Sequence, residues 1–197
     1  MDMAKMFITL TVVCAIAAAS LAKVYDGTKD AIAEAKRQEI LRAIKTVLPT
    51  FDNAPDQDVV DLPSGKDKKG NVVKTTFYRG TKGGEFVGVA FKTSSMEGYS
   101  GLIEVMVGVD PLGTVTAIEI VSHAETPGLG DKITFDWFKK QYKGKSLDNA
   151  NWLVKKDGGD FDQITGATIS PRAVTQAVKK GLDFFLAHKN EIMNQAG

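Results

Sequence analysis

An uncharged apolar run occupies residues 6–22, near the N-terminal end of the chain. A helix that crosses a bilayer needs about 17–25 apolar residues, so this run predicts one membrane-spanning anchor within residues 1–27. Tyr25 follows where the membrane interface is expected. A cleaved signal peptide is the alternative, because Lys5 supplies a short positive start and residues 20–22 end in a small residue.

Helical spacing continues after this apolar run. Apolar residues between 28 and 48 recur mostly at three- and four-residue steps, which is typical of an amphipathic helix. Pro49 ends the pattern, so residues 28–49 are expected to form a connector helix that docks on the following domain. The polar segment 50–70 is rich in turn formers and is expected to be a loop at the start of a single domain over residues 50–197.

The middle of the chain shows strand signals. A glycine-rich turn at residues 80–84 and an Asp-Pro-Leu-Gly turn at residues 110–113 each lie between two apolar segments, which predicts two hairpins. Residues 103, 105, 107 and 109 are all apolar and share one alternating face. We therefore expect a largely antiparallel sheet. The predicted strands are residues 72–78, 85–92, 101–109 and 114–121.

The C-terminal part returns to helical patterns. Residues 134–143 predict a short helix, residues 151–155 a short strand, and residues 171 to about 193 the clearest helix of the chain. The expected fold class is α+β, a mostly antiparallel sheet packed with helices and preceded by one N-terminal transmembrane helix. The apolar stripe of the last helix, expected to lie in the core, is Val174, Ala177, Val178, Leu182 and Phe185.

Composition limits the chemistry that the chain can perform. The net charge is +1 and no basic block is present, which argues against nucleic-acid binding. The single cysteine, Cys14, excludes an internal disulfide and an iron–sulfur site. The two histidines, His123 and His188, are far apart in the sequence and give no metal-ligand spacing. Any redox activity must therefore come from an organic cofactor.

One stretch combines hydroxyl side chains with an expected helix start, at residues 162–174. Ser170 is expected to be the N-cap and Pro171 the first helical residue. The start of a helix favours a phosphate through its unpaired N–H groups, and Arg172 could add a charged donor. An ordinary capped loop remains the alternative from these residues alone.

A second stretch, His123-Ala124-Glu125-Thr126-Pro127-Gly128-Leu129-Gly130, follows directly after a predicted strand. Its proline and glycines predict a tight loop with exposed backbone amides. The glycine spacing fits neither a dinucleotide-binding fingerprint nor a Walker loop. A structural turn is the ordinary interpretation of such a loop. His123 could be a proton donor or a structural residue, with the second preferred, and Glu125 could anchor the loop backbone.

The sequence Asp162-x-x-Thr165-Gly166-Ala167-Thr168 resembles the flavinylation motif of FMN-binding domains, and the His123–Gly130 stretch resembles the loop that lines the flavin in them. Gly98-Tyr99-Ser100-Gly101 is also similar to their middle segment. The resemblance implies FMN joined through its phosphate to the hydroxyl of Thr168, no metal and no catalytic side chain. The implied cofactor-binding residues are Thr168, Thr165, Gly166, Ala167, Glu125, Thr126, Gly128, Leu129 and Gly130.

This family includes the G-type component of the Rnf electron-transport complex and the C-type component of the sodium-pumping NADH:quinone oxidoreductase. The short chain is similar to the G-type component, which implies a relay between ferredoxin and NAD coupled to Na⁺ or H⁺ movement. Such a relay does not turn over alone. The alternatives are the C-type component of the quinone reductase, an anchored ligand-binding module without covalent flavin, and a soluble electron shuttle released by signal cleavage.

The resemblance also implies partners and a location. The partners are the other membrane subunits of an Rnf-type complex and a flavin transferase that makes the covalent bond. The family places the FMN domain outside the cytoplasm on a single-pass anchor. The positive-inside rule, applied to the basic residues on either side of the anchor, gives the opposite orientation. Because long domains can cross a membrane despite such charges, we expect the extracytoplasmic side. These basic residues are Lys5 before the anchor, and Lys23, Lys29, Lys36 and Arg37 after it.

Overall fold

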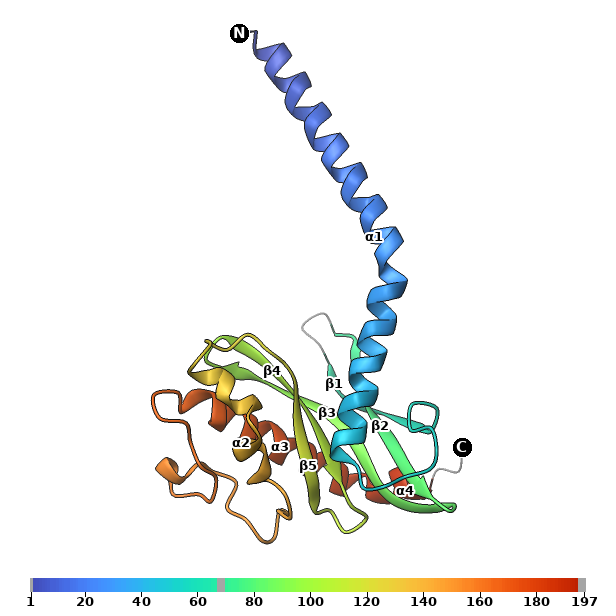
Figure 1. Cartoon of the computed structure of the whole chain (residues 1–197), viewed down its shortest axis with the longest axis vertical. Helices are drawn as coiled ribbons and strands as arrows, with labels where there is room; N and C mark the ends of the chain where they lie inside the picture. The colour runs from blue at the N-terminus through green and yellow to red at the C-terminus, as the bar shows by residue number, and fades with distance from the viewer. Residues whose placement is uncertain (1, 67–69, 195–197) are drawn as a thin grey trace. The chain divides into compact units, whose positions relative to one another are not determined.

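A computed structural model describes residues 2–66 and 70–194 of the 197-residue chain (Figure 1). The chain divides into two compact units, Met1–Ile40 and Leu41–Gly197. Helix α1 (Met3–Val47) belongs to the first unit as far as Ile40, and its last residues, from Leu41, belong to the second unit. Its side chains from residue 3 to residue 39 are exposed, and among the described residues it is the one helix long and apolar enough to cross a membrane.

The second unit contains a five-stranded sheet with the strand order β1-β2-β3-β4-β5. Every neighbouring pair is antiparallel, and the sheet packs with helices, so the predicted α+β class is confirmed. The four predicted strands all form, as β2, β3, β4 and β5. The strands are β1 (Val59–Lys66), β2 (Val72–Lys82), β3 (Glu85–Gly98), β4 (Gly101–Val109) and β5 (Val115–His123).

Strand β1 lies within the segment that the sequence predicts as a loop, so that prediction is wrong for Val59–Lys66. Its proline and glycine suggested a turn, but β1 is an edge strand, where a proline without an N–H donor is tolerated. A register shift between Pro63 and Gly65 accommodates both residues. The turn predicted at residues 80–84 is also shorter, because only Gly83 and Gly84, with φ of 59° and 83°, separate β2 from β3.

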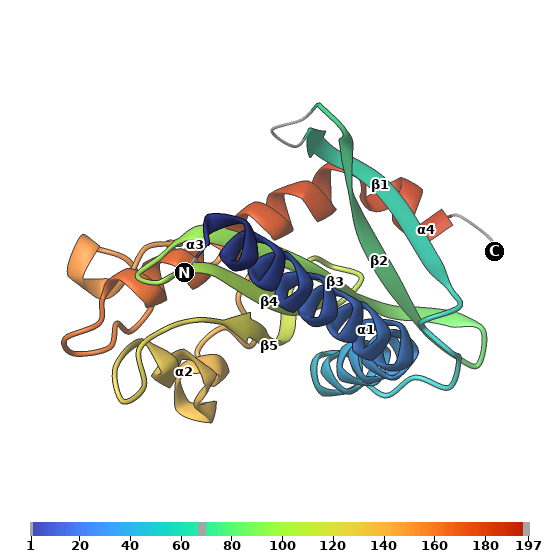
Figure 2. The ribbon, with the colours of Figure 1, turned by 90° about the horizontal axis from the view of Figure 1, so that it is seen from above.

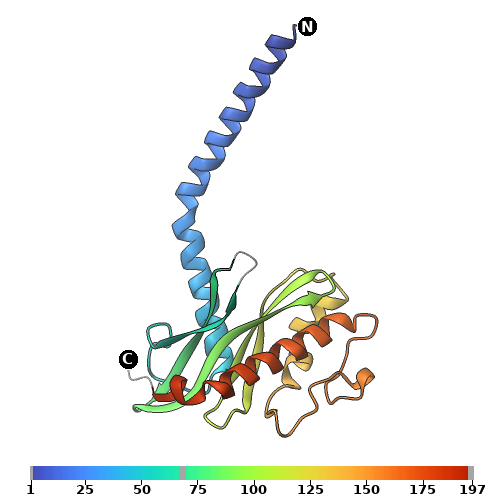
Figure 3. The same ribbon diagram turned by 180° about the vertical axis from the view of Figure 1, so that it is seen from behind.

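Helix α3 (Ile169–Ala187) lies across one face of the sheet, as Figure 3 shows from behind. Its predicted apolar stripe is fully buried, and so is the alternating apolar face of β4. The helix begins two residues earlier than predicted and ends at Ala187, where the short helix α4 (Lys189–Asn194) follows. The core of the domain therefore lies between α3 and the sheet.

The last turn of α1 packs on strands β4 and β5. Ile44 and Val47 are buried, and the Thr116 hydroxyl donates a hydrogen bond to the Val47 carbonyl. A side chain at Gly108 would collide with that carbonyl. The absence of a side chain at this position thus allows the end of the helix to approach the strand.

An aromatic cluster supports the chain that leads to the flavinylation motif. The rings of Tyr142, Trp152 and Phe161 pack against one another with centroids 4.7–6.3 Å apart. Tyr142 is fully buried, its hydroxyl lies 2.8 Å from the Thr175 hydroxyl, and burial raises its pKa. The predicted strand at residues 151–155 is only an isolated bridge between Val154 and Phe161.

Short helical pieces complete this region. Gly130–Thr134 and Lys155–Asp157 are 3-10 turns, and the helix predicted at residues 134–143 is limited to α2 (Asp136–Lys140).

Candidate functional site

Three segments that are far apart in the sequence enclose one pocket of 290 Å³. They are the turn between β3 and β4, the loop after β5, and the residues at the start of α3. Both sequence motifs therefore contribute to one site. The lining residues are Tyr99, Glu125, Thr126, Leu129, Gly130, Gly166, Ala167, Thr168, Ile169 and Ser170.

Glu125 connects the three segments. Its side chain is only 5% exposed. One carboxylate oxygen accepts a hydrogen bond from the Ser170 hydroxyl at 2.5 Å, and the other accepts one from the Ser100 backbone N–H at 3.1 Å. The backbone N–H of Glu125 donates in turn to Nδ1 of His123 at 3.1 Å. The carboxylate thus holds the β3–β4 turn and α3 against the loop after β5.

Two glycines make room for this carboxylate. A Cβ added to Gly98 would lie 2.7 Å from one Glu125 oxygen, and a Cβ added to Gly130 would collide with the other oxygen. Gly130 also faces Ser170, whose Oγ would lie 2.7 Å from the added carbon. Since real side chains do not approach so closely, both positions require glycine for the loop to close on Glu125.

The flavinylation motif forms a tight turn before α3. The Ala167 N–H donates to the Ile164 carbonyl at 3.0 Å, and Gly166 takes a left-handed φ of 80° that suits glycine. Thr168 is the N-cap residue of α3 and makes no side-chain capping bond. The prediction that Ser170 caps the helix is wrong: Ser170 and Pro171 lie inside the first turn.

The three hydroxyl side chains of residues 162–174 have different surroundings. Thr168 is half-buried and lines the pocket. Ser170 also lines it, but its side chain is fully buried and bonded to Glu125. Thr165 is exposed and lies outside the lining. Among these three residues, Thr168 therefore presents the hydroxyl that lines the pocket and is not held by Glu125.

Two charged residues of the stretch 162–174 form ion pairs with the surrounding structure. Arg172 binds Asp157 through two short contacts of 2.5 and 2.6 Å, which lower the pKa of Asp157 and raise that of Arg172. The expectation that Arg172 serves as a phosphate donor is therefore not supported by its position. Asp162 forms an ion pair with Lys155 at 2.7 Å and does not line the pocket.

Among the residues predicted to bind the cofactor, seven line the pocket, whereas Thr165 and Gly128 do not. The pocket adds the buried Ser170 and also Tyr99 and Ile169, which are 71% and 43% exposed. Tyr99 lies inside the Gly-Tyr-Ser-Gly segment. The similarity of this segment to FMN-binding domains was the signal in the sequence that could have identified Tyr99 as a pocket residue.

Cationic side chains are absent from the described lining of the pocket. The first N–H groups of a helix have no partner within the helix and carry partial positive charge. The start of α3 therefore offers the pocket its positive end, next to the Thr168 hydroxyl. No group of three metal-ligating side chains was found among the described residues. The arrangement suits a phosphate ester with an apolar ring system beside it.

The FMN-binding domain family matches residues 98–183, a span that contains every lining residue of the pocket. Curated relatives extend the match to nearly the full chain. The G-type component of the ion-translocating oxidoreductase complex of Aliivibrio fischeri strain ES114 is 42% identical, with 90% of this chain and 88% of the relative covered. Its counterpart from Pseudoalteromonas atlantica is 38% identical, with 97% and 92% covered.

The chain belongs to the family of G-type subunits of ion-translocating oxidoreductase complexes, which contain an FMN-binding domain. The resemblance expected from the two motifs is thereby confirmed, together with the class of redox-complex subunit.

Solved structures share the fold. NqrC of Shewanella oneidensis has a TM-score of 0.51 at 22% identity, covering 72% of this chain and 74% of that chain. The C-type component of the Na⁺-translocating NADH-quinone reductase of Parabacteroides distasonis has a TM-score of 0.53 at 18% identity, covering 82% and 92%.

Proposed function

We propose that this chain is a covalent FMN electron-relay subunit of a membrane-bound, Rnf-type oxidoreductase, with FMN esterified to Thr168. The observation that carries the proposal is the position of the Thr168 hydroxyl. Thr168 lines the pocket at the start of α3, and its hydroxyl makes no capping hydrogen bond to the helix. The names of the relatives, subunits of ion-translocating oxidoreductase complexes, support the assignment to such a complex.

Each part of the pocket has a role in this proposal. The start of α3 stabilises the phosphate charge, an effect worth about 0.3–1 kcal/mol at an exposed site. Gly166 and Ala167 leave the hydroxyl accessible. Leu129 and Ile169 provide partly exposed apolar surface for the ring system.

Attachment requires a separate flavin transferase and an activated FMN donor. The Thr168 oxygen forms the new bond to phosphorus, the bond from phosphorus to the leaving group of the donor breaks, and the hydroxyl proton passes to a base of the transferase. Glu125 is poorly placed to act as this base, because both of its oxygens already accept hydrogen bonds.

Bound FMN supplies one- and two-electron transfer, which connects obligate two-electron carriers with one-electron carriers. The chain itself holds the cofactor and excludes water from part of it. The remaining subunits of the complex supply the donor and acceptor of electrons and the path of Na⁺ or H⁺. A covalent bond prevents loss of the cofactor to the solvent.

The proposal is tested by mass spectrometry of the chain produced with a flavin transferase. Trypsin should release the peptide of residues 157–172 with the added mass of FMN less one water, and fragmentation should place that mass on Thr168. A colourless protein with an unmodified peptide would instead favour a ligand-binding module. If the assembled complex transfers electrons from NADH to quinone, and not between ferredoxin and NAD, the C-type alternative is favoured.

We also propose that α1 is retained as a single-pass anchor and that the FMN domain is extracytoplasmic. A suitable probe is Lys143→Cys, an exposed position outside the pocket, in a chain whose native Cys14 is replaced by serine. An impermeant thiol reagent is expected to label this cysteine in intact cells. Labelling only after lysis would place the domain in the cytoplasm, and loss of the α1 peptide from the mature chain would indicate a cleaved signal.

A further inference from the structure

The five-stranded sheet splits between β2 and β3. The two strands pair from the hairpin turn only as far as Phe77 and Phe91. Beyond that point the residues of β2 pair only with β1, and the residues of β3 pair only with β4. Figure 2 shows the β1–β2 ribbon leaving the plane of β3 and β4. Two adjacent strands thus present facing edges that do not pair with each other.

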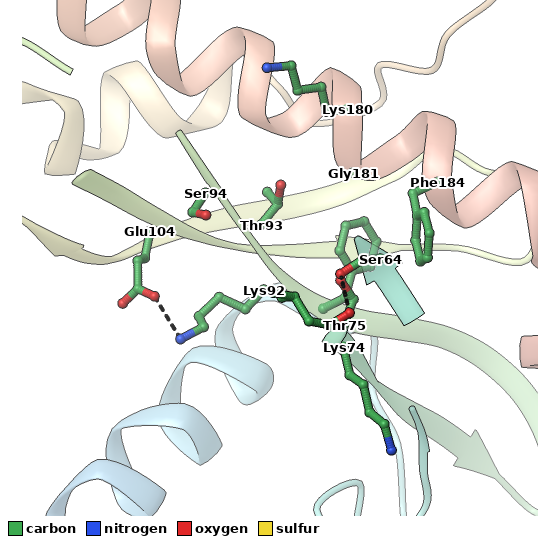
Figure 4. A pocket seen from close by; sticks show the side chains of 12 residues that line it. Ser64, Lys74, Thr75, Lys92, Thr93, Ser94, Glu104, Lys180, Gly181 and Phe184 are labelled. Carbon is green, nitrogen blue, oxygen red and sulfur yellow. Dashed lines mark hydrogen bonds and ion pairs between the residues drawn. The ribbon is translucent and has the colours of Figure 1, made fainter. Parts of the chain in front are cut away.

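A cleft of 530 Å³ occupies this split. Residues of β2 and β3 line it together with α3, which contributes Lys180, Gly181 and Phe184 (Figure 4). Phe91 and Phe184 form its apolar end. Both rings pack against the buried Phe77, with centroids 5.1 Å (Phe91) and 6.0 Å (Phe184) from the Phe77 ring. None of its lining residues belongs to the flavin pocket.

Helix α3 supports the β3 edge of the cleft. The Thr93 hydroxyl donates to the Ala177 carbonyl of α3 at 3.0 Å. Gly181 brings α3 so close that an added Cβ would lie 2.6 Å from the Phe91 ring. Residues 92–95 pair with β4 on one side only, so the N–H and C=O groups on their other side have no strand partner among the described residues.

The charge around the cleft is positive. Lys92 forms an ion pair with Glu104 at 2.8 Å. Neither Lys74 nor Lys180 has an ion-pair partner among the described residues, and Figure 4 shows them on opposite sides of the cleft. The lysine side chains point in different directions, so they do not converge on one small anion.

We propose that the split between β2 and β3 is a docking groove for an extended acidic segment of a partner protein, which adds a strand to β3 along residues 92–95. A four-residue strand spans about 13 Å. Backbone pairing gives affinity in this mode, and side chains give specificity. An apolar residue of the partner contacts Phe184, and its carboxylates face Lys74 and Lys180. This proposal is independent of the flavin.

The test uses the full chain in mild detergent and a fluorescein-labelled hexapeptide of alternating glutamate and valine. Anisotropy should give a Kd below about 1 mM, and amide hydrogen exchange should slow at residues 92–95. The double variant Lys74→Glu/Lys180→Glu should weaken binding by roughly tenfold or more, because it reverses both rim charges. A peptide N-methylated at alternate residues keeps its charge but loses N–H donors, and it should also bind at least about tenfold more weakly.

The matched control is Lys140→Glu/Lys143→Glu, which changes the net charge equally at exposed residues outside the cleft and should leave the affinity unchanged. Equal weakening by both double variants, or unimpaired binding of the N-methylated peptide, would overturn the proposal, as would a Kd above about 1 mM. Protection of residues 92–95 in nanodiscs of anionic lipid, without peptide, would assign the cleft to the membrane surface and also overturn it.

Discussion

Replacing Thr168 with valine is expected to abolish covalent flavin completely, while the domain keeps its fold. Valine has nearly the same shape but lacks the oxygen that forms the ester. The Thr168 hydroxyl makes no capping bond to α3, so its loss should cost well under about 1 kcal/mol of stability. The measurement is in-gel flavin fluorescence of the denatured chain, together with its thermal unfolding.

Two matched variants make this result specific. Thr168→Ser retains a hydroxyl and should restore fluorescence, at least in part. Thr165→Val removes the exposed neighbouring hydroxyl outside the pocket and should leave attachment unchanged. Full fluorescence of the Thr168→Val chain would disprove Thr168 as the attachment residue, and loss in Thr165→Val alone would move the ester to Thr165.

Removal of the Glu125 carboxylate should give the largest loss of stability at the site. Glu125→Ala leaves the Ser100 N–H and the buried Ser170 hydroxyl without their acceptor. Each such loss costs about 1–3 kcal/mol, so we expect a total of about 2–6 kcal/mol. For a domain of this size, this lowers the melting temperature by about 4–24 °C. Flavin attachment should fall with it, because α3 and the loop after β5 are no longer joined.

Glu125→Gln is the appropriate comparison. Its amide oxygen can accept from the Ser100 N–H and its NH₂ group can donate to the Ser170 hydroxyl, so it should lose less than half as much stability as the alanine variant. Denaturant unfolding of full-length chains in the same detergent measures both. Equal stability of the wild-type and alanine chains would show that the two hydrogen bonds do not hold the site together.

Local patterns predicted much of the fold. The alternating apolar residues of β4 and the stripe of α3 are buried as expected, because burial of one face creates these periods. Strand β1 was missed because Pro63 and Gly65 are turn formers, and their tolerance depends on the position of β1 at the sheet edge. An edge position is a property of the complete sheet and cannot be read from eight residues.

The site was predictable in its parts but not in its contacts. Glycine spacing and the family resemblance pointed to residues of both motifs, which do meet in one pocket. The partners of Ser170 and Arg172 depended on distant chain segments, Glu125 and Asp157. A serine before a proline is a good cap by local rules, but here a buried carboxylate takes its hydroxyl and the helix begins earlier.

The bond between Ser170 and Glu125 joins residues that are 45 positions apart in the sequence. An unfolded chain does not bring them together, so Thr168 takes its place at the pocket only after the sheet and α3 have assembled. Attachment of FMN at this position would then follow folding in time. In the proposed role, the fraction of chains that carry covalent flavin therefore reports the fraction that have folded.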